Sequence, residues 1–266
     1  MEVRALAIYL DSPPEIGRLT KLAAGLAAQL ESMLIGLATT APKPLSKGAS
    51  LTFQPAAAQD RDLAITMKRM EASFRGLAEG IKVEWRAAIS PNPTDFVLEQ
   101  AAIADLIMVE HKTGSDSVGR LDIGRLVMEA GRPVLLLPPQ IDSLSMDRVL
   151  IAYKPVKAGR MAVQAALPLL RLARRILIVG IGPEASSAQV DDVQRYLSRH
   201  EIDAAVRHEA DPLETTSDTL LNLAKDDGSQ LLVGGAYSRG RARQMLFGGV
   251  TRDLFSRAHL PWLLTH

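Results

Sequence analysis

Two short apolar runs, Arg4-Ala-Leu-Ala-Ile-Tyr9 and Arg148-Val-Leu-Ile-Ala-Tyr153, repeat one pattern about half a chain apart. Each run has the length of a β-strand, and a stretch rich in Ala and Leu with helical spacing follows each of them. Later strands match in the same way: Leu106-Ile-Met-Val109 with Leu231-Leu-Val-Gly234, and Pro133-Val-Leu-Leu-Leu137 with Pro261-Trp-Leu-Leu-Thr265. The sequence therefore predicts two copies of one structural unit.

Strand and helix patterns alternate through both halves. The expected strands are residues 3–10, 33–39, 81–88, 104–110, 133–138, 148–153, 175–181, 203–208, 230–235 and 261–265. The expected helices are residues 15–31, 58–79, 93–103, 121–130, 158–173, 186–200, 214–226 and 249–258. Short, fully apolar strands are typical of parallel sheets covered on both faces. We therefore predict an α/β fold with a doubly wound, five-stranded parallel sheet in each half.

The predicted boundaries place one domain at residues 1–138, a linker with Pro and Ser at residues 139–147, and a second domain at residues 148–266. A second irregular stretch, residues 39–57, contains three prolines and has no counterpart of equal length in the second half. It is expected to be an insertion, and a lid over a site is the alternative.

Composition excludes several classes of function. The 31 basic and 30 acidic residues leave a net charge of +1, which argues against a dedicated nucleic-acid binder. The absence of cysteine excludes disulfides and cysteine-ligated metal sites and suits a reducing cytoplasm. The five histidines are scattered without metal-ligand spacing. No signal peptide and no apolar run of about 18 residues is present, so we expect a cytoplasmic protein without membrane or nucleic-acid partners.

One segment of the second half has the features of a phosphate-binding loop. A strand ends at Gly234-Gly235, a basic loop follows, and further glycines precede the last helix. The candidate nucleotide-binding residues of this segment are Gly235, Ser238, Arg239, Gly240, Gly248, Gly249 and Val250. Glycines let backbone N–H groups approach phosphates, and a helix N-terminus carries partial positive charge. The structural alternative is that the glycines only allow a tight helix start and that the arginines form a solvated loop without a ligand.

This segment resembles the universal stress protein family, whose members are UspA-like. The resemblance implies a Rossmann-like fold of the adenine-nucleotide alpha-hydrolase-like type. The family loop has glycine, two residues, glycine, nine residues, then glycine with Ser or Thr, and it holds the phosphates of ATP in nucleotide-binding members. Gly235 and Gly248 match the first and third glycines, whereas Ser238 and Gly249 depart from the pattern. The Gly-Gly-Val-Thr-Arg run that begins at Gly248 is similar to the tandem, two-domain members.

The resemblance also implies an acidic residue after the first strand, which contacts adenine. Asp11 fits this role in the first half, and Lys154 occupies the position in the second half. The loop of the first half, from Glu110 to Gly124, has glycines but not their spacing. The resemblance thus implies a degenerate adenine-nucleotide site, for ATP with Mg or for AMP, that is more intact in the second half. It also implies that the two domains pair through strands 133–138 and 261–265.

Two other chemistries remain open. Gly180-Ile-Gly182-Pro-Glu-Ala185 resembles a dinucleotide fingerprint, with Glu209 as the ribose-binding acid, although the strand before it is second in its repeat. Ser238, Asp253 and His259 follow the order of a hydrolase triad, but about ten residues separate the serine from the next helix.

The favoured function is a non-catalytic stress-response sensor or binding module. A weak ATPase, an enzyme for another phosphorylated ligand, and a module that binds only protein partners are the alternatives. A homodimer and further protein partners are expected, and their identity does not follow from the residues.

Overall fold

The computed structural model describes residues 2–11, 13–40, 56–90, 92–111, 121–139, 141–182, 185–210, 214–236 and 259–266. Strands and helices alternate along these ranges, as predicted. Of the predicted elements, the helix at 249–258 lies outside the described residues, as do residues 41–55 of the predicted insertion.

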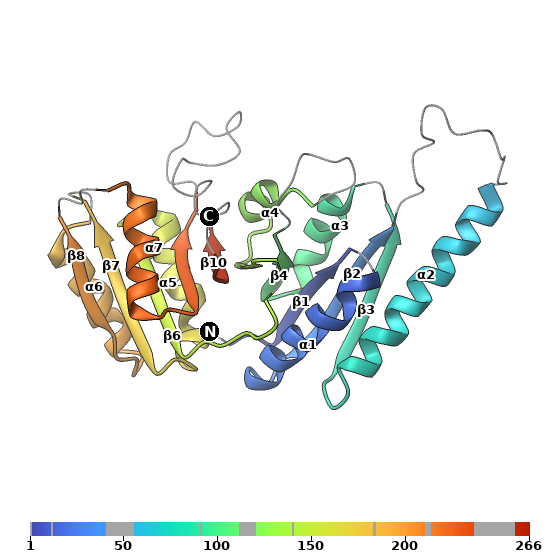
Figure 1. The fold of residues 1–266 in the computed structure, drawn as a ribbon, viewed down its shortest axis with the longest axis horizontal. Helices are drawn as coiled ribbons and strands as arrows, with labels where there is room; N and C mark the ends of the chain where they lie inside the picture. Colours follow the sequence, from blue (N-terminus) through green and yellow to red (C-terminus); the bar gives the residue numbers. More distant parts are fainter. Residues whose placement is uncertain are drawn as a thin grey trace.

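All ten described strands belong to one sheet (Figure 1). The first half contributes β1 (Ala5–Leu10), β2 (Met33–Thr40), β3 (Val83–Ile89), β4 (Leu106–Glu110) and β5 (Val134–Leu137). The second half contributes β6 (Arg148–Tyr153), β7 (Arg175–Ile181), β8 (Ala205–Glu209), β9 (Leu231–Gly235) and β10 (Trp262–Thr265). The strand order is β3-β2-β1-β4-β5-β10-β9-β6-β7-β8, so both halves have the same internal order.

The two five-stranded sheets meet at β5 and β10. Within each half every pair of neighbouring strands is parallel, whereas β5 and β10 are antiparallel, with Leu136 opposite Trp262 and Val134 opposite Leu264. The junction strands are buried and almost entirely apolar. Figure 1 places the C-terminus beside β10, in the middle of the sheet.

Helices cover both faces of the sheet, as a doubly wound fold requires. They are α1 (Pro13–Gln29), α2 (Ala56–Leu77), α3 (Pro93–Gln100), α4 (Ile123–Glu129), α5 (Lys157–Leu170), α6 (Ser187–Ser198) and α7 (Thr216–Asp227), with a 3₁₀ turn at Ala101–Ile103. Buried residues of α1, α2, α5 and α6 form one apolar core with the sheet, and those of α3, α4 and α7 form the other. Each core contains residues from both halves.

Local sequence signals fix several helix ends. Asn92 caps α3, since its side-chain oxygen accepts from the Thr94 amide at 3.1 Å, and Pro93 occupies the first turn, where no amide donor is needed. Thr215 caps α7 by accepting from the Asp218 amide at 3.2 Å. Gly228 ends α7 with φ +67°, a left-handed conformation that glycine adopts without steric cost.

The strand pairing corrects the alignment of the two halves by one residue. Leu6 pairs with Leu106, and Val149 pairs with Leu231, so Leu6 is equivalent to Val149. The predicted match of Tyr9 with Tyr153 is therefore wrong. The two tyrosines face opposite sides of the sheet, because side chains alternate along a strand: Tyr9 packs in the core of α3, α4 and α7, and Tyr153 against the other core.

The corrected register places Asp11 and Lys154 at equivalent positions, since each directly follows the first strand of its half. Glu110 and Gly235 are equivalent at the ends of β4 and β9. Within the described ranges, no helix combines the length and the apolar character needed to cross a bilayer.

Candidate functional site

The ends of β6 and β9 meet the start of α5 at one edge of the sheet. Lys154 follows β6, Gly235 ends β9, and Ala158 and Gly159 belong to the first turn of α5. We call these four residues the strand-end site. In open α/β sheets, ligands bind outside the carboxyl ends of the strands, which is where these residues lie.

Gly159 allows α5 to turn tightly onto the end of β6. A Cβ atom at Gly159 would lie 2.1 Å from the carbonyl oxygen of Lys154, a distance that no side chain could occupy. The same carbonyl accepts a hydrogen bond from the Val156 amide at 2.8 Å. The backbone between β6 and α5 is therefore wound closely around the position of Lys154.

Gly235 brings the start of α5 into contact with β9. A Cβ atom at Gly235 would lie 2.5 Å from the carbonyl carbon of Ala158 and 2.6 Å from the amide nitrogen of Gly159. The buried Thr265 hydroxyl donates to the Ala158 carbonyl at 2.9 Å, and the Ala236 amide donates to the Thr265 carbonyl at 2.8 Å. The start of α5 is thus fixed on β9 by close backbone contact and on β10 by the Thr265 hydroxyl.

This arrangement has the chemistry of an anion site. The N-terminus of α5 carries the partial positive charge of the helix dipole, and its N-cap residue, Val156, has no polar side-chain atom to accept from the first amides. Lys154 adds a formal positive charge on the segment that leads into α5. Phosphate oxygens are the ligands best suited to this combination.

The structure brings Lys154 and Gly235 together but places Asp11 in the first half, at the end of β1, where it is exposed. Ser238, Arg239, Gly240, Gly248, Gly249 and Val250 lie outside the described residues, so their assignment stays a prediction. Sequence reasoning missed Ala158, Gly159 and Thr265. The run Lys157-Ala158-Gly159 at a predicted helix start was the available signal, because small residues there permit close approach to a strand.

The first half carries a different set of side chains at the equivalent positions. The backbone is conserved between halves: the His111 amide donates to the Leu137 carbonyl at 2.7 Å, as the Ala236 amide does to Thr265. At the position of Gly235, however, stands Glu110, whose carboxylate pairs with the guanidinium of Arg18 on α1. The Glu110 side chain is 5% exposed and the Arg18 side chain 24%. Burial also lowers the pKa of His111.

Comparison with solved structures gives the fold a name. A universal stress protein from Archaeoglobus fulgidus superposes with a TM-score of 0.76 at 15% identity, and the match covers 97% of each chain. The universal stress protein fold is therefore the fold of this chain. A universal stress protein from Pseudomonas aeruginosa matches with a TM-score of 0.60 at 15% identity, over 99% of this chain and 93% of the other. By sequence, no family model and no curated protein matches.

The dinucleotide fingerprint has a structural role in this universal stress protein fold. Gly180 lies within β7, and a Cβ atom there would lie 2.5 Å from a methyl group of Val190 on α6. Glycine thus lets α6 pack closely on β7. Glu209, the predicted ribose-binding acid, instead pairs with Arg207 at 2.5 Å. Of the predicted hydrolase triad, Ser238 and Asp253 lie outside the described residues, and His259 lies within them.

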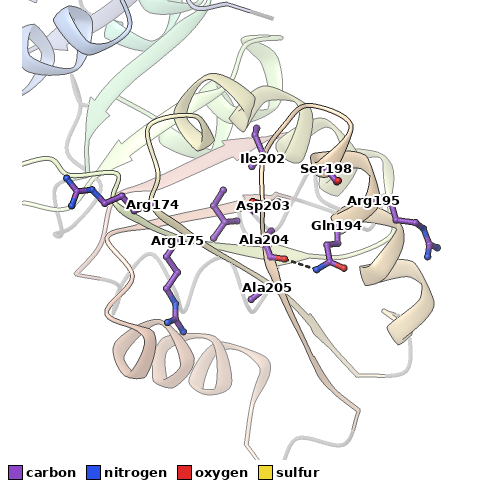
Figure 2. Close-up of a pocket in the computed structure, with 10 residues that line it drawn as sticks. Arg174, Arg175, Gln194, Arg195, Ser198, Ile202, Asp203, Ala204 and Ala205 are labelled. Atoms are coloured by element: carbon purple, nitrogen blue, oxygen red, sulfur yellow. Dashed lines mark hydrogen bonds between the residues drawn. The ribbon is translucent and has the colours of Figure 1, made fainter.

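A hollow of about 610 Å³ lies at the opposite edge of the sheet, at the start of β7 and β8. Arg174, Arg175 and Arg195 line it, but Figure 2 shows their guanidinium groups pointing away from one another. Arg175 pairs with the buried Asp227 at 2.7 Å, and Arg195 pairs with Asp192 on its own helix. The hollow therefore has no converging cations. Among the described residues, no group of three potential metal-ligating side chains occurs.

Tyr9 is buried near the end of β1, and we expect it to make the free energy of unfolding depend on pH. The Tyr9 hydroxyl lies 2.8 Å from the Thr39 hydroxyl, and burial raises the pKa of Tyr9 to about 12. Because the unfolded chain releases this proton near pH 10 and the folded chain near pH 12, the free energy of unfolding should fall across that window, by about 2 kcal/mol from this group.

Urea unfolding of wild type and Tyr9→Phe at pH 8, 10 and 11.5 measures this contribution. The variant should lose about 1 kcal/mol at pH 8 through the missing hydroxyl pair, and its stability should fall less steeply above pH 10. Parallel pH curves for the two proteins would show that Tyr9 does not titrate as stated.

Proposed function

We propose that this chain is a tandem universal stress protein that acts as a non-catalytic sensor and binds the phosphates of an adenine nucleotide at the strand-end site. The observation that carries the proposal is the convergence of Gly235 and the backbone of Lys154 on the start of α5, whose N-cap residue, Val156, makes no side-chain cap hydrogen bond. A lysine and a helix N-terminus together favour a ligand with several negative charges. ATP with Mg and AMP are the ligands to test first.

The same proposal divides the chain into two domains, residues 1–138 and 148–266, joined by the linker 139–147. Identical strand order in the two halves supports this division. Pairing of the two domains within one chain is supported by the β5–β10 contact. A homodimer and protein partners that respond to ligand binding belong to the proposal as well, as does a cytoplasmic location.

Substitution of Lys154 tests the assignment of the site. Lys154→Ala should weaken ATP binding about tenfold, since a charge-assisted contact to phosphate contributes about 1.4 kcal/mol. Isothermal titration calorimetry with ATP and Mg, and separately with AMP, measures the affinity. Lys21→Ala is the matched control, because Lys21 is an exposed lysine on α1 of the other half.

Equal affinities of wild type and Lys154→Ala would contradict the role of Lys154. Release of ADP measured in the same samples separates the sensor from the enzymatic alternative. A sensor should release no more ADP than the buffer does. Lys154 stands where the family resemblance implies an acid that contacts adenine, so inorganic phosphate and a sugar phosphate are included as ligands without adenine.

A further inference from the structure

We propose that Glu110 closes the first-half counterpart of the strand-end site to phosphate, so that each chain binds a single nucleotide, in its second half. The inference rests on the proposed function and adds the residue that makes the two halves differ. Three residues of the first half are involved: Asp11 follows β1, Arg18 lies on α1, and Glu110 ends β4.

The two halves are equivalent in backbone but differ in charge at this edge of the sheet. The strand register matches Asp11 with Lys154 and Glu110 with Gly235. The second half therefore carries one lysine and a glycine at these positions, whereas the first half carries Asp11 and a glutamate that is paired with Arg18. A phosphate in the first half would be repelled by the carboxylate of Asp11. At the equivalent position of the second half, the ammonium group of Lys154 would attract it.

Glu110 also fills, in the first half, the space that corresponds to the one left by Gly235 for the start of α5 in the second half. In the second half, the backbone of Ala158 and Gly159 lies where a side chain at position 235 would begin. In the first half, the position holds a full glutamate side chain that is 95% shielded from solvent, as its 5% exposure shows. The start of α1 therefore cannot lie on β4 as the start of α5 lies on β9.

The only cation that faces Glu110 in the described contacts is already engaged on both sides. One terminal nitrogen of Arg18 pairs with the Glu110 carboxylate, and the other donates to the carbonyl of Ile141 in the linker at 2.8 Å. With both terminal nitrogens engaged, the guanidinium is held in place by the protein and does not turn freely toward a phosphate. Removal of the Glu110 carboxylate should release one terminal nitrogen of Arg18. The guanidinium should then be able to bind a phosphate, because arginine binds phosphate through paired N–H groups.

Photolabelling with 8-azido-ATP, followed by peptide mapping, tests the inference. The wild type should be labelled only within residues 148–266, and Glu110→Gly should add a label within residues 1–138 of comparable amount. Excess ATP should suppress both labels. Glu110→Gln is the matched control: it removes the charge but keeps the bulk and a hydrogen-bond acceptor for Arg18, so it should label the first half several-fold less than Glu110→Gly.

Each outcome separates this inference from the proposed function. Label in the first half of the wild type, or no new label in Glu110→Gly, overturns the inference and leaves a second-half site standing. An unlabelled wild type with a labelled first half in Glu110→Gly supports the closure by Glu110 but overturns the single second-half nucleotide, and with it the proposed function. No label in either protein overturns both. If Glu110→Gly fails to fold by circular dichroism, Glu110→Ala is judged by the same criteria.

Discussion

Gly159→Ala should lower the free energy of unfolding by about 3 kcal/mol and abolish ligand binding at the strand-end site. The added methyl group would lie 2.1 Å from the carbonyl oxygen of Lys154, which belongs to the backbone and cannot rotate away as a side chain can. Relief of the clash requires α5 to move off β6. The same movement would displace the helix N-terminus and Lys154 from each other.

Gly235→Ala should have a similar effect from the opposite side of the contact. Its Cβ atom would lie 2.5 Å and 2.6 Å from backbone atoms of Ala158 and Gly159. Gly25→Ala is the matched control, since Gly25 is an exposed residue of α1 whose added methyl group meets no atom within 4 Å. It should stabilise the protein by about 0.5–1 kcal/mol, because alanine favours a helix interior.

Urea unfolding of the three variants, with nucleotide affinity measured on the folded proteins, checks this prediction. The largest loss of stability should belong to Gly159→Ala, and Gly25→Ala should keep wild-type affinity. If Gly235→Ala were as stable as Gly25→Ala, the close contact between α5 and β9 would be refuted.

Arg18→Met should cost about 3 kcal/mol of unfolding free energy, because it leaves the buried Glu110 carboxylate without its partner. Glu110→Gln should cost only about 1 kcal/mol, since Arg18 is more exposed and retains the bond to Ile141. The two single substitutions of one ion pair are thus expected to differ, with the greater loss where the more deeply buried charge remains.

The double variant Arg18→Met with Glu110→Leu completes the cycle. With both charges removed, most of the stability lost in Arg18→Met should return, as apolar replacement of a buried ion pair is often neutral. Arg75→Met is the control for a surface pair: Arg75 and Glu71 lie one turn apart on α2, and their side chains are 49% and 35% exposed, so the loss should stay below about 0.5 kcal/mol. Equal losses in Arg18→Met and Arg75→Met would contradict the burial argument.

The fold could be predicted from the sequence because its strands are short, apolar and regularly separated by helical patterns. This pattern predicts the strands Val134–Leu137 and Leu231–Gly235, and the structure confirms both. The one-residue error between Tyr9 and Tyr153 has the same origin. A strand buried on both faces has no alternation of polar and apolar residues, so its sequence does not reveal which side chain faces which core.

The candidate site was predictable only where a residue directly ends a strand. Lys154 and Gly235 carry that signal, and the structure places them together. Arg18 and Glu110 are separated by 92 positions, and nothing in either local sequence indicates that the fold pairs them. Gly159 was missed because a glycine near a helix start is common and its contact partner comes from another strand.

The central position of β10 has a consequence for biosynthesis. Translation produces β5 long before β10, since Leu136 pairs with a residue, Trp262, that follows it by almost half of the chain. Until β10 leaves the ribosome, the Val134–Leu137 edge is an open, wholly apolar strand of the kind that recruits other chains. A nascent or truncated chain should therefore depend on chaperones, and two such chains could satisfy this edge by exchanging strands with each other.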